Sequence, residues 1–218
     1  MSRLDRLDER YHAHHEGAKQ EFVFGGDERG ELFASVVGGP GRRILDLGCR
    51  TGALAAYYAP GNEVVGVDVD RDALARAAER LGIETVWADV EAGLPFEDES
   101  FDVVVAGELL EHLADPAAAV ANVRRVLRPG GLFIGSVPNA FRLKSRIAYA
   151  RGRYPADWDP THLQLFTPDA LRALLAGFED VHIRFAIGRL VPLNARLMAN
   201  VQIFTARRPS TASATGTA

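Results

Sequence analysis

The chain has 218 residues, a formal net charge of −4 and 47% hydrophobic residues. These values are typical of one globular domain with a full core, and they exclude a disordered chain, a fibrous one and a general nucleic-acid coat protein. The single cysteine, Cys49, excludes an internal disulfide framework and suits a reducing compartment. We find no signal-peptide core after Met1 and no apolar stretch of about 20 residues, so we expect a cytoplasmic protein without a membrane span.

Short apolar runs alternate with helix-forming segments through most of the chain. We expect strands at residues 43–47, 63–69, 84–88, 102–106 and 132–137, and helices at 73–81, 116–127 and 168–175. Near-continuous Val and Ile runs separated by helices predict a parallel sheet with both faces covered. Two later strands, 181–187 and 200–206, have no helix predicted between them, which indicates an antiparallel hairpin at the sheet edge.

The first strand ends in a glycine-rich turn with the sequence DLGCRTG, which begins at Asp46. Glycines let the backbone approach a ligand closely and adopt positive φ. A dinucleotide-binding turn has the pattern G-x-G-x-x-G, and here Arg50 and Ala53 stand where its second and third glycines would be. The carboxylate of Asp46 would also face a positively charged amino group more favourably than a phosphate. The next strand ends at Asp68, which could accept both hydroxyls of a ribose. The pattern predicts a zwitterionic nucleoside ligand.

Several stretches in this order resemble the class I S-adenosylmethionine (SAM) dependent methyltransferases. They are ILDLGCRTG (44–52), VVGVDVD (64–70), ADV (88–90), LPFEDESFDVVVAGELLEHL (94–113), VLRPGGLFIGSVPN (126–139) and HLQLFTPDALRALL (162–175). The resemblance implies an α/β, Rossmann-like fold with a seven-stranded, mostly parallel sheet, helices on both faces and an antiparallel last strand. We accordingly expect an N-terminal helical lid and substrate segment (1–40), a methyltransferase domain (41–208) and a disordered tail (209–218).

The resemblance also assigns the cofactor site. Asp46 and Gly48 would hold the methionine end of SAM, Asp68 the ribose hydroxyls, and Asp89 with Val90 the adenine. The full expected cofactor set is Asp46, Gly48, Cys49, Arg50, Gly52, Asp68, Val69, Asp89, Val90 and Gly107. Arg50 stands where the family usually has glycine, so it is strained if its φ is positive and otherwise free to reach the substrate or nearby carboxylates.

A group of acidic and histidine residues follows the strand 102–106. Glu108, Glu111 and His112 would share one face if the segment is helical, and His162 could supply a fourth ligand. This pattern is similar to that of ubiquinone-pathway O-methyltransferases and small-RNA 2′-O-methyltransferases, where it implies a metal that orients the acceptor hydroxyl; Mg²⁺ is the ion we consider. The alternative is a metal-free site in which His112 acts as the general base beside Glu108.

The acceptor site is expected at Tyr11, Asn139, Trp158 and His162, beside a run of basic and aromatic residues at 141–158 that could grip an anionic, flat or membrane-derived substrate. We predict methyl transfer from SAM to a small-molecule acceptor, at a hydroxyl. One alternative is 2′-O-methylation of an RNA end or nucleoside, which the net charge of −4 and the lack of a recognisable RNA module oppose. Another is a SAM-binding regulatory module without activity. The sequence leaves the oligomeric state open.

Overall fold

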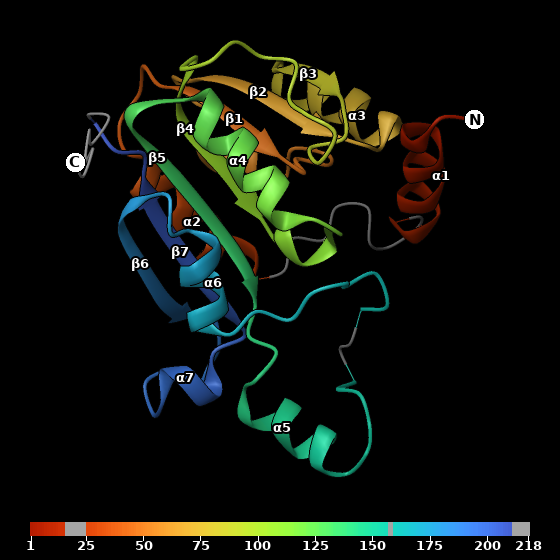
Figure 1. The fold of residues 1–218 in the computed structure, drawn as a ribbon, viewed down its shortest axis with the longest axis vertical. Coiled ribbons are helices and arrows are strands. Elements are labelled where there is room, and N and C mark those ends of the chain that lie inside the picture. Colours follow the sequence, from red (N-terminus) through yellow and green to blue (C-terminus); the bar gives the residue numbers. More distant parts are fainter. Residues whose placement is uncertain (16–24, 157–158, 211–218) are drawn as a thin grey trace, which may run out of the picture.

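The computed structural model describes residues 1–15, 25–156 and 159–210, and its centre is a seven-stranded sheet (Figure 1). The strand order is β3-β2-β1-β4-β5-β7-β6. The strands are β1 (Arg43–Leu47), β2 (Glu63–Asp68), β3 (Glu84–Trp87), β4 (Phe101–Gly107), β5 (Leu127–Pro138), β6 (Glu179–Ala186) and β7 (Val201–Arg207). The first five are parallel, while β7 lies antiparallel between β5 and β6. The expected α/β fold with an antiparallel last strand is confirmed.

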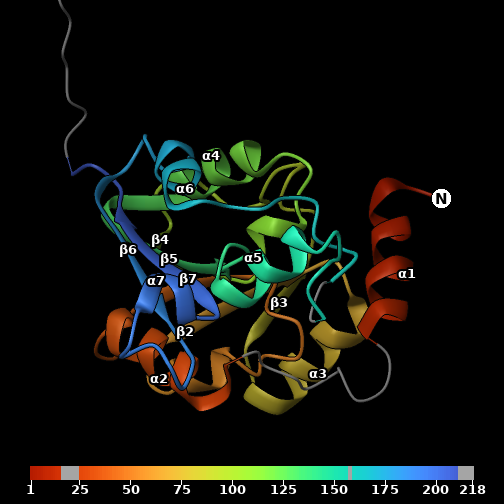
Figure 2. The same cartoon turned by 90° about the horizontal axis from the view of Figure 1, so that it is seen from below.

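Helices cover both faces of the sheet (Figure 2). The described residues form α1 (Arg3–His15), α2 (Gly26–Val37), α3 (Arg71–Leu81), α4 (Pro116–Val126), α5 (Leu143–Ala150), α6 (Pro168–Leu174) and α7 (Ala195–Met198), with short 3₁₀ turns at Ala55–Tyr57 and Leu110–His112. Of these, α4 and α6 lie on one face of the sheet and α2 and α3 on the other (Figure 2). Side chains of α4 and α6 pack in one core cluster, with Val120 and Leu171 buried there. Phe33 and Val37 of α2 pack in the cluster on the other face. The buried residues of α2, which are Arg29, Gly30, Phe33 and Val37, therefore belong to the core. The lid and substrate role expected for residues 1–40 stays a prediction.

Polar caps define where the helices begin. The side chains of Asp70, Asp115 and Thr167 each accept a hydrogen bond from the backbone N–H three residues later, at the starts of α3, α4 and α6. At the end of α3, Gly82 adopts the left-handed conformation. These caps fix the helix starts close to the residues that the sequence predicts.

Two elements differ from expectation. β5 begins at Leu127 rather than residue 132, because Gly130 and Gly131 exchange backbone hydrogen bonds with Arg208 and so extend the sheet. The connection between β6 and β7 contains the short helix α7, whose first turn is capped by the side chain of Asn194. Neither feature changes the topology.

The carboxyl ends of β1, β2 and β4 lie side by side, since Leu47 pairs with Val67 on one side and with Ala106 on the other. Ligands of open α/β sheets bind at this edge. The topology therefore brings together the residues that follow these three strands. No helix in the part of the chain that the structure describes is long and apolar enough to cross a bilayer.

Candidate active site

The turn after β1 has the backbone geometry that glycine favours. Gly48 and Gly52 have φ values of 70° and 71°. The backbone N–H groups of Gly48 and Cys49 donate to Val67 O at 2.8 and 3.2 Å, which ties the turn to β2. A Cβ on Gly52 would come within 2.7 Å of a Leu81 methyl carbon. The turn therefore needs small residues for both conformation and space.

Arg50 lies in the same turn with φ of 48°. This is the left-handed region, where a side chain costs free energy that glycine does not pay. Its backbone N–H donates to Asp68 Oδ2 at 2.9 Å, and the charges of Asp68 and Asp70 act on its guanidinium. The sequence left open whether the backbone of Arg50 is strained, and the structure shows the strained, positive φ. The guanidinium also lies near the carboxylates of Asp68 and Asp70.

Asp68 is held in one orientation by backbone donors. Its Oδ1 accepts from the N–H groups of Val69 and Asp70 at 2.7 and 3.0 Å, and its Oδ2 accepts from Arg50. Burial raises the pKa of this carboxyl, while the three hydrogen bonds oppose that effect. A carboxylate fixed in this way at the end of β2 is suited to accept hydrogen bonds from two adjacent hydroxyls.

Asp46 is the penultimate residue of β1 and is buried, with 2% of its surface exposed. Burial raises its pKa to about 7, although Tyr58 Oη donates to Asp46 Oδ2 at 2.9 Å and thereby favours the charged form. The charge of Arg29 also favours ionised Asp46. A cationic ligand group would remove the cost of ionising this carboxyl.

Arg29 is a site residue that the sequence analysis missed. It projects from α2 and is 5% exposed, with Nη1 at 3.6 Å from Glu108 Oε1 and 3.5 Å from Ser136 Oγ. Its Nε has no hydrogen-bond partner among the described residues. The signal was available, because residues 29, 33 and 37 are spaced by four and form the buried face of α2, where an arginine needs a partner.

Asp89 lies after β3 and is also buried. Its Oδ1 accepts from Glu91 N at 3.0 Å, and its Oδ2 lies 2.8 Å from Nε of Arg3. Arg3 belongs to α1 and also pairs with Glu91 at 2.6 Å. The expected adenine residue therefore already has a cationic partner from the N-terminal helix. Val90, beside it, is buried.

Further contacts hold α1 along this edge of the sheet. Asp8 accepts from Arg71 N at 3.1 Å, and His12 Nδ1 lies 3.6 Å from Asp70 Oδ1. Tyr11 meets His112 edge to face, with ring centroids 6.1 Å apart. This contact brings a predicted acceptor residue beside the predicted base. The contacts place α1 beside the start of α3, the residues after β3 and the histidine cluster.

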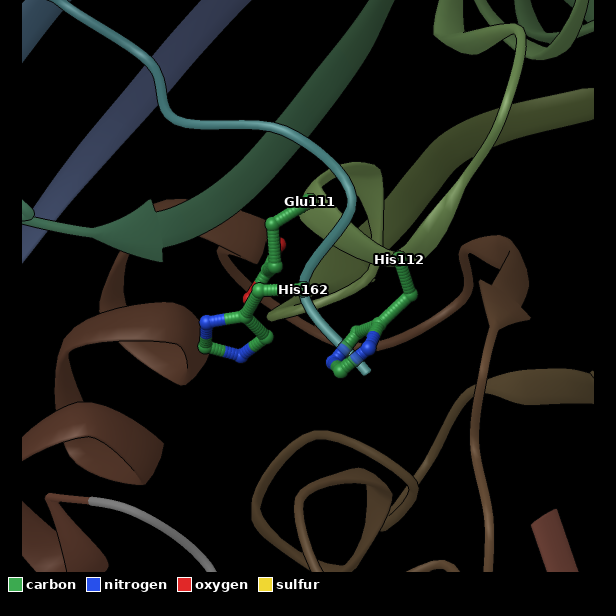
Figure 3. A group of neighbouring side chains, drawn as sticks. All are labelled: Glu111, His112 and His162. Atoms are coloured by element: carbon green, nitrogen blue, oxygen red, sulfur yellow. The ribbon is translucent and has the colours of Figure 1, made fainter. Parts of the chain in front are cut away.

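Three of the four predicted metal-site residues come together (Figure 3). Ligand atoms of Glu111, His112 and His162 all lie within 4.8 Å of one another. Glu111 and His112 come from the 3₁₀ turn after β4, and His162 comes from a second segment that passes over this turn, where Leu163 N donates to Glu111 O at 2.8 Å. Both carboxylate oxygens of Glu111 are buried without a partner among the described residues.

Glu108 does not join this group. It has φ of 56° and precedes the 3₁₀ turn, so the helical face that the spacing predicted is not formed. Its carboxylate faces Arg29 instead. The cluster therefore contains one carboxylate and two imidazoles rather than the two of each that the sequence suggested.

His112 is oriented by Thr161 and Asp159, which the sequence analysis did not single out. Thr161 Oγ1 donates to Asp159 Oδ1 at 2.6 Å and lies 3.0 Å from His112 Nδ1. Since the hydroxyl proton is directed at Asp159, the arrangement favours a His112 tautomer with the proton on Nδ1, which donates toward Thr161. Nε2 is then left as the basic nitrogen.

The cluster favours neutral imidazoles. Burial and the nearby His162 lower the pKa of His112 to about 4, and burial lowers the pKa of His162 as well. Burial raises the pKa of Glu111 well above its ordinary value, and the neighbouring carboxylate of Glu108 adds to this effect. A cation bound among these groups would make ionised Glu111 favourable.

The remaining predicted residues have the following places. Asn139 is 4% exposed, and its amide nitrogen donates to Arg196 O and Ala199 O at 3.0 Å, which gives it a structural task at the end of β5. Cys49 is buried. Gly107 packs closely against Leu54, because a Cβ at this position would come 2.7 Å from a Leu54 methyl carbon. Trp158 lies outside the described residues.

Comparison with known proteins identifies a domain in this chain. The family described as "Methyltransferase domain" matches residues 45–135. A protein of Mycolicibacterium smegmatis named "Probable S-adenosylmethionine-dependent methyltransferase" is 37% identical over 142 residues, which are 64% of this chain and 52% of that protein. The ubiquinone biosynthesis O-methyltransferase of Dinoroseobacter shibae is 38% identical over 152 residues, 65% of this chain and 61% of that one.

The chain contains a methyltransferase domain like that of the class I SAM-dependent methyltransferases. A crystal structure of a SAM-dependent methyltransferase from Archaeoglobus fulgidus has the same fold, with a TM-score of 0.66 and 20% identity over 91% of this chain and 99% of that one. The methyltransferase described here spans between one half and two thirds of the length of the two curated relatives. Its buried carboxylates and the unpartnered Nε of Arg29 fit a cofactor that carries both an ammonium and a carboxylate.

Proposed function

We propose that this methyltransferase transfers the methyl group of SAM to a hydroxyl of a small-molecule acceptor. The observation that carries the proposal is the position of the His112 cluster at the same sheet edge as Asp46 and Asp68. The O-methyltransferase name of one relative gives further support for a hydroxyl acceptor. When bound, SAM supplies an electrophilic methyl group on a sulfonium.

In the proposed cofactor site, Asp46 receives the α-ammonium group and Asp68 the ribose hydroxyls. Arg29 receives the α-carboxylate, because its buried Nε has no other partner among the described residues and its charge already acts on Asp46. Asp89 receives the adenine amino group beside Arg3. These four side chains are buried or ordered by hydrogen bonds, so the protein would hold the reacting methyl in a fixed position.

On the acceptor side, His112 is the proposed general base. With Nδ1 directed toward Thr161, its Nε2 would take the proton of the acceptor hydroxyl as the new O–C bond forms and the S–C bond breaks, with S-adenosylhomocysteine as the leaving group. A neutral imidazole is needed for this step, and the low pKa of His112 supplies it across the neutral pH range. Tyr11 covers one edge of the ring and restricts how an acceptor can approach.

As the alternative to a free general base, we propose that Glu111, His112 and His162 hold a divalent ion, in which case His112 would be a ligand of the ion and would not take the proton of the acceptor. Two imidazoles with one carboxylate are a donor set for zinc, iron or manganese, whereas magnesium prefers oxygen ligands and water. The donor set therefore does not fit the Mg²⁺ considered from the sequence. The buried and unpartnered oxygens of Glu111 are the observation that points to a cation here.

Two measurements test the proposed function. Calorimetric titration with S-adenosylhomocysteine is expected to show one site per chain. The native protein is expected to transfer a labelled methyl group from SAM to a member of a panel of catechols, phenols and aliphatic alcohols, and the His112→Gln variant is expected to lose this transfer. Label transferred to short RNA or nucleosides alone would favour the nucleoside alternative. Cofactor binding without transfer to any acceptor class would favour the regulatory module and overturn the proposal.

A further inference from the structure

Exposed apolar side chains are concentrated at one end of the molecule. Among the described residues, five of the eight exposed large hydrophobic side chains lie in residues 143–154 and 189–196, and they are Leu143, Ile147, Tyr154, Leu190 and Leu193. Two of these, Leu193 and Tyr154, are 76% and 71% exposed. We call the surface formed by these two segments the basic apolar face. Such a concentration of exposed apolar side chains marks an interaction site rather than ordinary surface.

The two segments lie together. Arg142, at the start of α5, hydrogen-bonds to Asn200, which follows α7, and Asn139 donates to Arg196 O within α7 at 3.0 Å. Figure 1 shows α5 and α7 projecting beyond the carboxyl end of β5. The chain leaves β5 at Pro138, passes through α5 and returns at His162. The first segment of the basic apolar face thus lies between β5 and the histidine cluster, and the second lies between β6 and β7.

All formally charged side chains of the basic apolar face are positive. Its two segments contain Lys144, Arg146, Arg151, Arg153, Arg189 and Arg196 and no aspartate or glutamate, although the whole chain carries a net charge of −4. No carboxylate of a described residue forms an ion pair with the five arginines of this set. The face therefore presents a positive surface to any partner, against the overall charge of the protein.

We propose that the basic apolar face docks on the surface of an anionic lipid bilayer. Interleaved cations and exposed leucines match such a surface, because the cations face lipid phosphates while the apolar side chains enter the boundary between headgroups and acyl chains. Leu143 and Ile147 are four residues apart on one side of α5, and Lys144 and Arg146 flank them. A nucleic acid would match the cations but not the leucines, so the leucines decide between the two partners.

This inference does not depend on the proposed methyl transfer, since it concerns binding of the whole chain to lipid. Docking at this face would place the His112 side of the protein toward the bilayer, which suits an acceptor that resides in the membrane. Each cation near an anionic bilayer is expected to strengthen binding about fivefold, and each buried leucine adds a comparable or larger factor.

The test is sedimentation of the full chain with vesicles of phosphatidylcholine alone and of phosphatidylcholine mixed with phosphatidylglycerol. We expect binding to the mixed vesicles only, weakened about 25-fold by the double variant R151S/R153S and at least tenfold by L190S/L193S. The matched control is R42S/R80S, which removes two exposed arginines near the amino end of β1 and the end of α3 and is expected to bind as the native chain does.

Three outcomes would overturn the proposal. The first is that the protein sediments equally with both vesicle types, or that it sediments with neither of them. The second is loss of binding in the arginine variant without loss in the leucine variant, which would indicate that charge alone attracts the protein to the vesicles and that the apolar side chains do not enter the bilayer. The third is an equal loss in R42S/R80S, which would indicate an effect of net charge alone. All of the substituted side chains are exposed, so thermal unfolding of the variants should match that of the native chain.

Discussion

The Thr161 hydroxyl lies 3.0 Å from Nδ1 of His112 and donates its own proton to Asp159 at 2.6 Å. This chain of contacts joins the segment that carries His162 to the turn after β4. It sets which nitrogen of His112 is basic, and it does so through residues that do not themselves face the acceptor. Thr161 is therefore a positioning residue in the proposed reaction.

We expect Thr161→Val to lower kcat by about 10- to 100-fold, because the His112 ring loses the partner that fixes its tautomer and orientation. KM for SAM should stay within about twofold, since Thr161 makes no contact in the proposed cofactor site. Thr161→Ser keeps the hydroxyl and should restore most of the activity. Equal losses in the valine and serine variants would show that only packing had been disturbed.

Cofactor affinity should depend on pH through Asp46. Its pKa of about 7 means that, in the absence of cofactor, the carboxyl is largely protonated below that pH, whereas the α-ammonium of S-adenosylhomocysteine needs the ionised form. We expect the dissociation constant to rise by up to about tenfold for each pH unit below about 7 and to level off above it. Calorimetry at a series of pH values measures this.

Tyr58→Phe provides the matched variant. The lost hydrogen bond from Tyr58 normally favours ionised Asp46, so its removal should shift the midpoint of the affinity profile to higher pH. Methylthioadenosine has no amino-acid end, and its affinity should not follow the same profile. A flat profile for both ligands would remove Asp46 from the cofactor site.

Arg29→Met should weaken S-adenosylhomocysteine binding by at least about tenfold, because the α-carboxylate would lose its charge-assisted partner. The same variant should bind methylthioadenosine as the native protein does. This second ligand also reports whether the variant is folded, which matters since Arg29 is the buried partner of Glu108. Equal weakening of both ligands would mean that Arg29 supports the fold and does not contact the cofactor.

Arg50→Gly should raise the free energy of unfolding relative to Arg50→Ala by about 1 kcal/mol, because alanine retains the strain of the positive φ and glycine does not. Both variants lack the guanidinium, so their difference isolates the backbone. Urea unfolding followed by circular dichroism measures it. Equal stabilities would indicate that the turn relaxes to a negative φ when the arginine is removed.

The Glu111, His112 and His162 cluster should bind about one zinc or manganese ion per chain and should bind magnesium far more weakly. Elemental analysis after dialysis against each ion measures this. Glu111→Gln and His162→Ala should each lower the occupancy, whereas Glu108→Gln should not, because Glu108 faces Arg29. Loss of metal in Glu108→Gln alone would contradict the three-residue site.

The sequence by itself determined the parallel sheet, the order of its strands and helices, and the turn at Gly48. These features follow from local patterns: apolar runs alternate with helix formers, and helices begin at capping side chains such as Asp70. The positions of Asp46 and Asp68 could be predicted in the same way, because parallel strands bring their carboxyl ends to one edge of the sheet.

Tertiary structure decided which of the charged residues meet. The spacing of Glu108, Glu111 and His112 predicts a shared helical face, but the chain forms only a 3₁₀ turn after the positive φ of Glu108. The Glu108 carboxylate faces Arg29, whereas that of Glu111 lies with the two histidines. Arg29 pairs with Glu108, which is 79 positions away in the sequence, and Thr161 contacts His112, which is 49 positions away. Such contacts depend on how helices and loops pack across the sheet, which local periodicity does not encode.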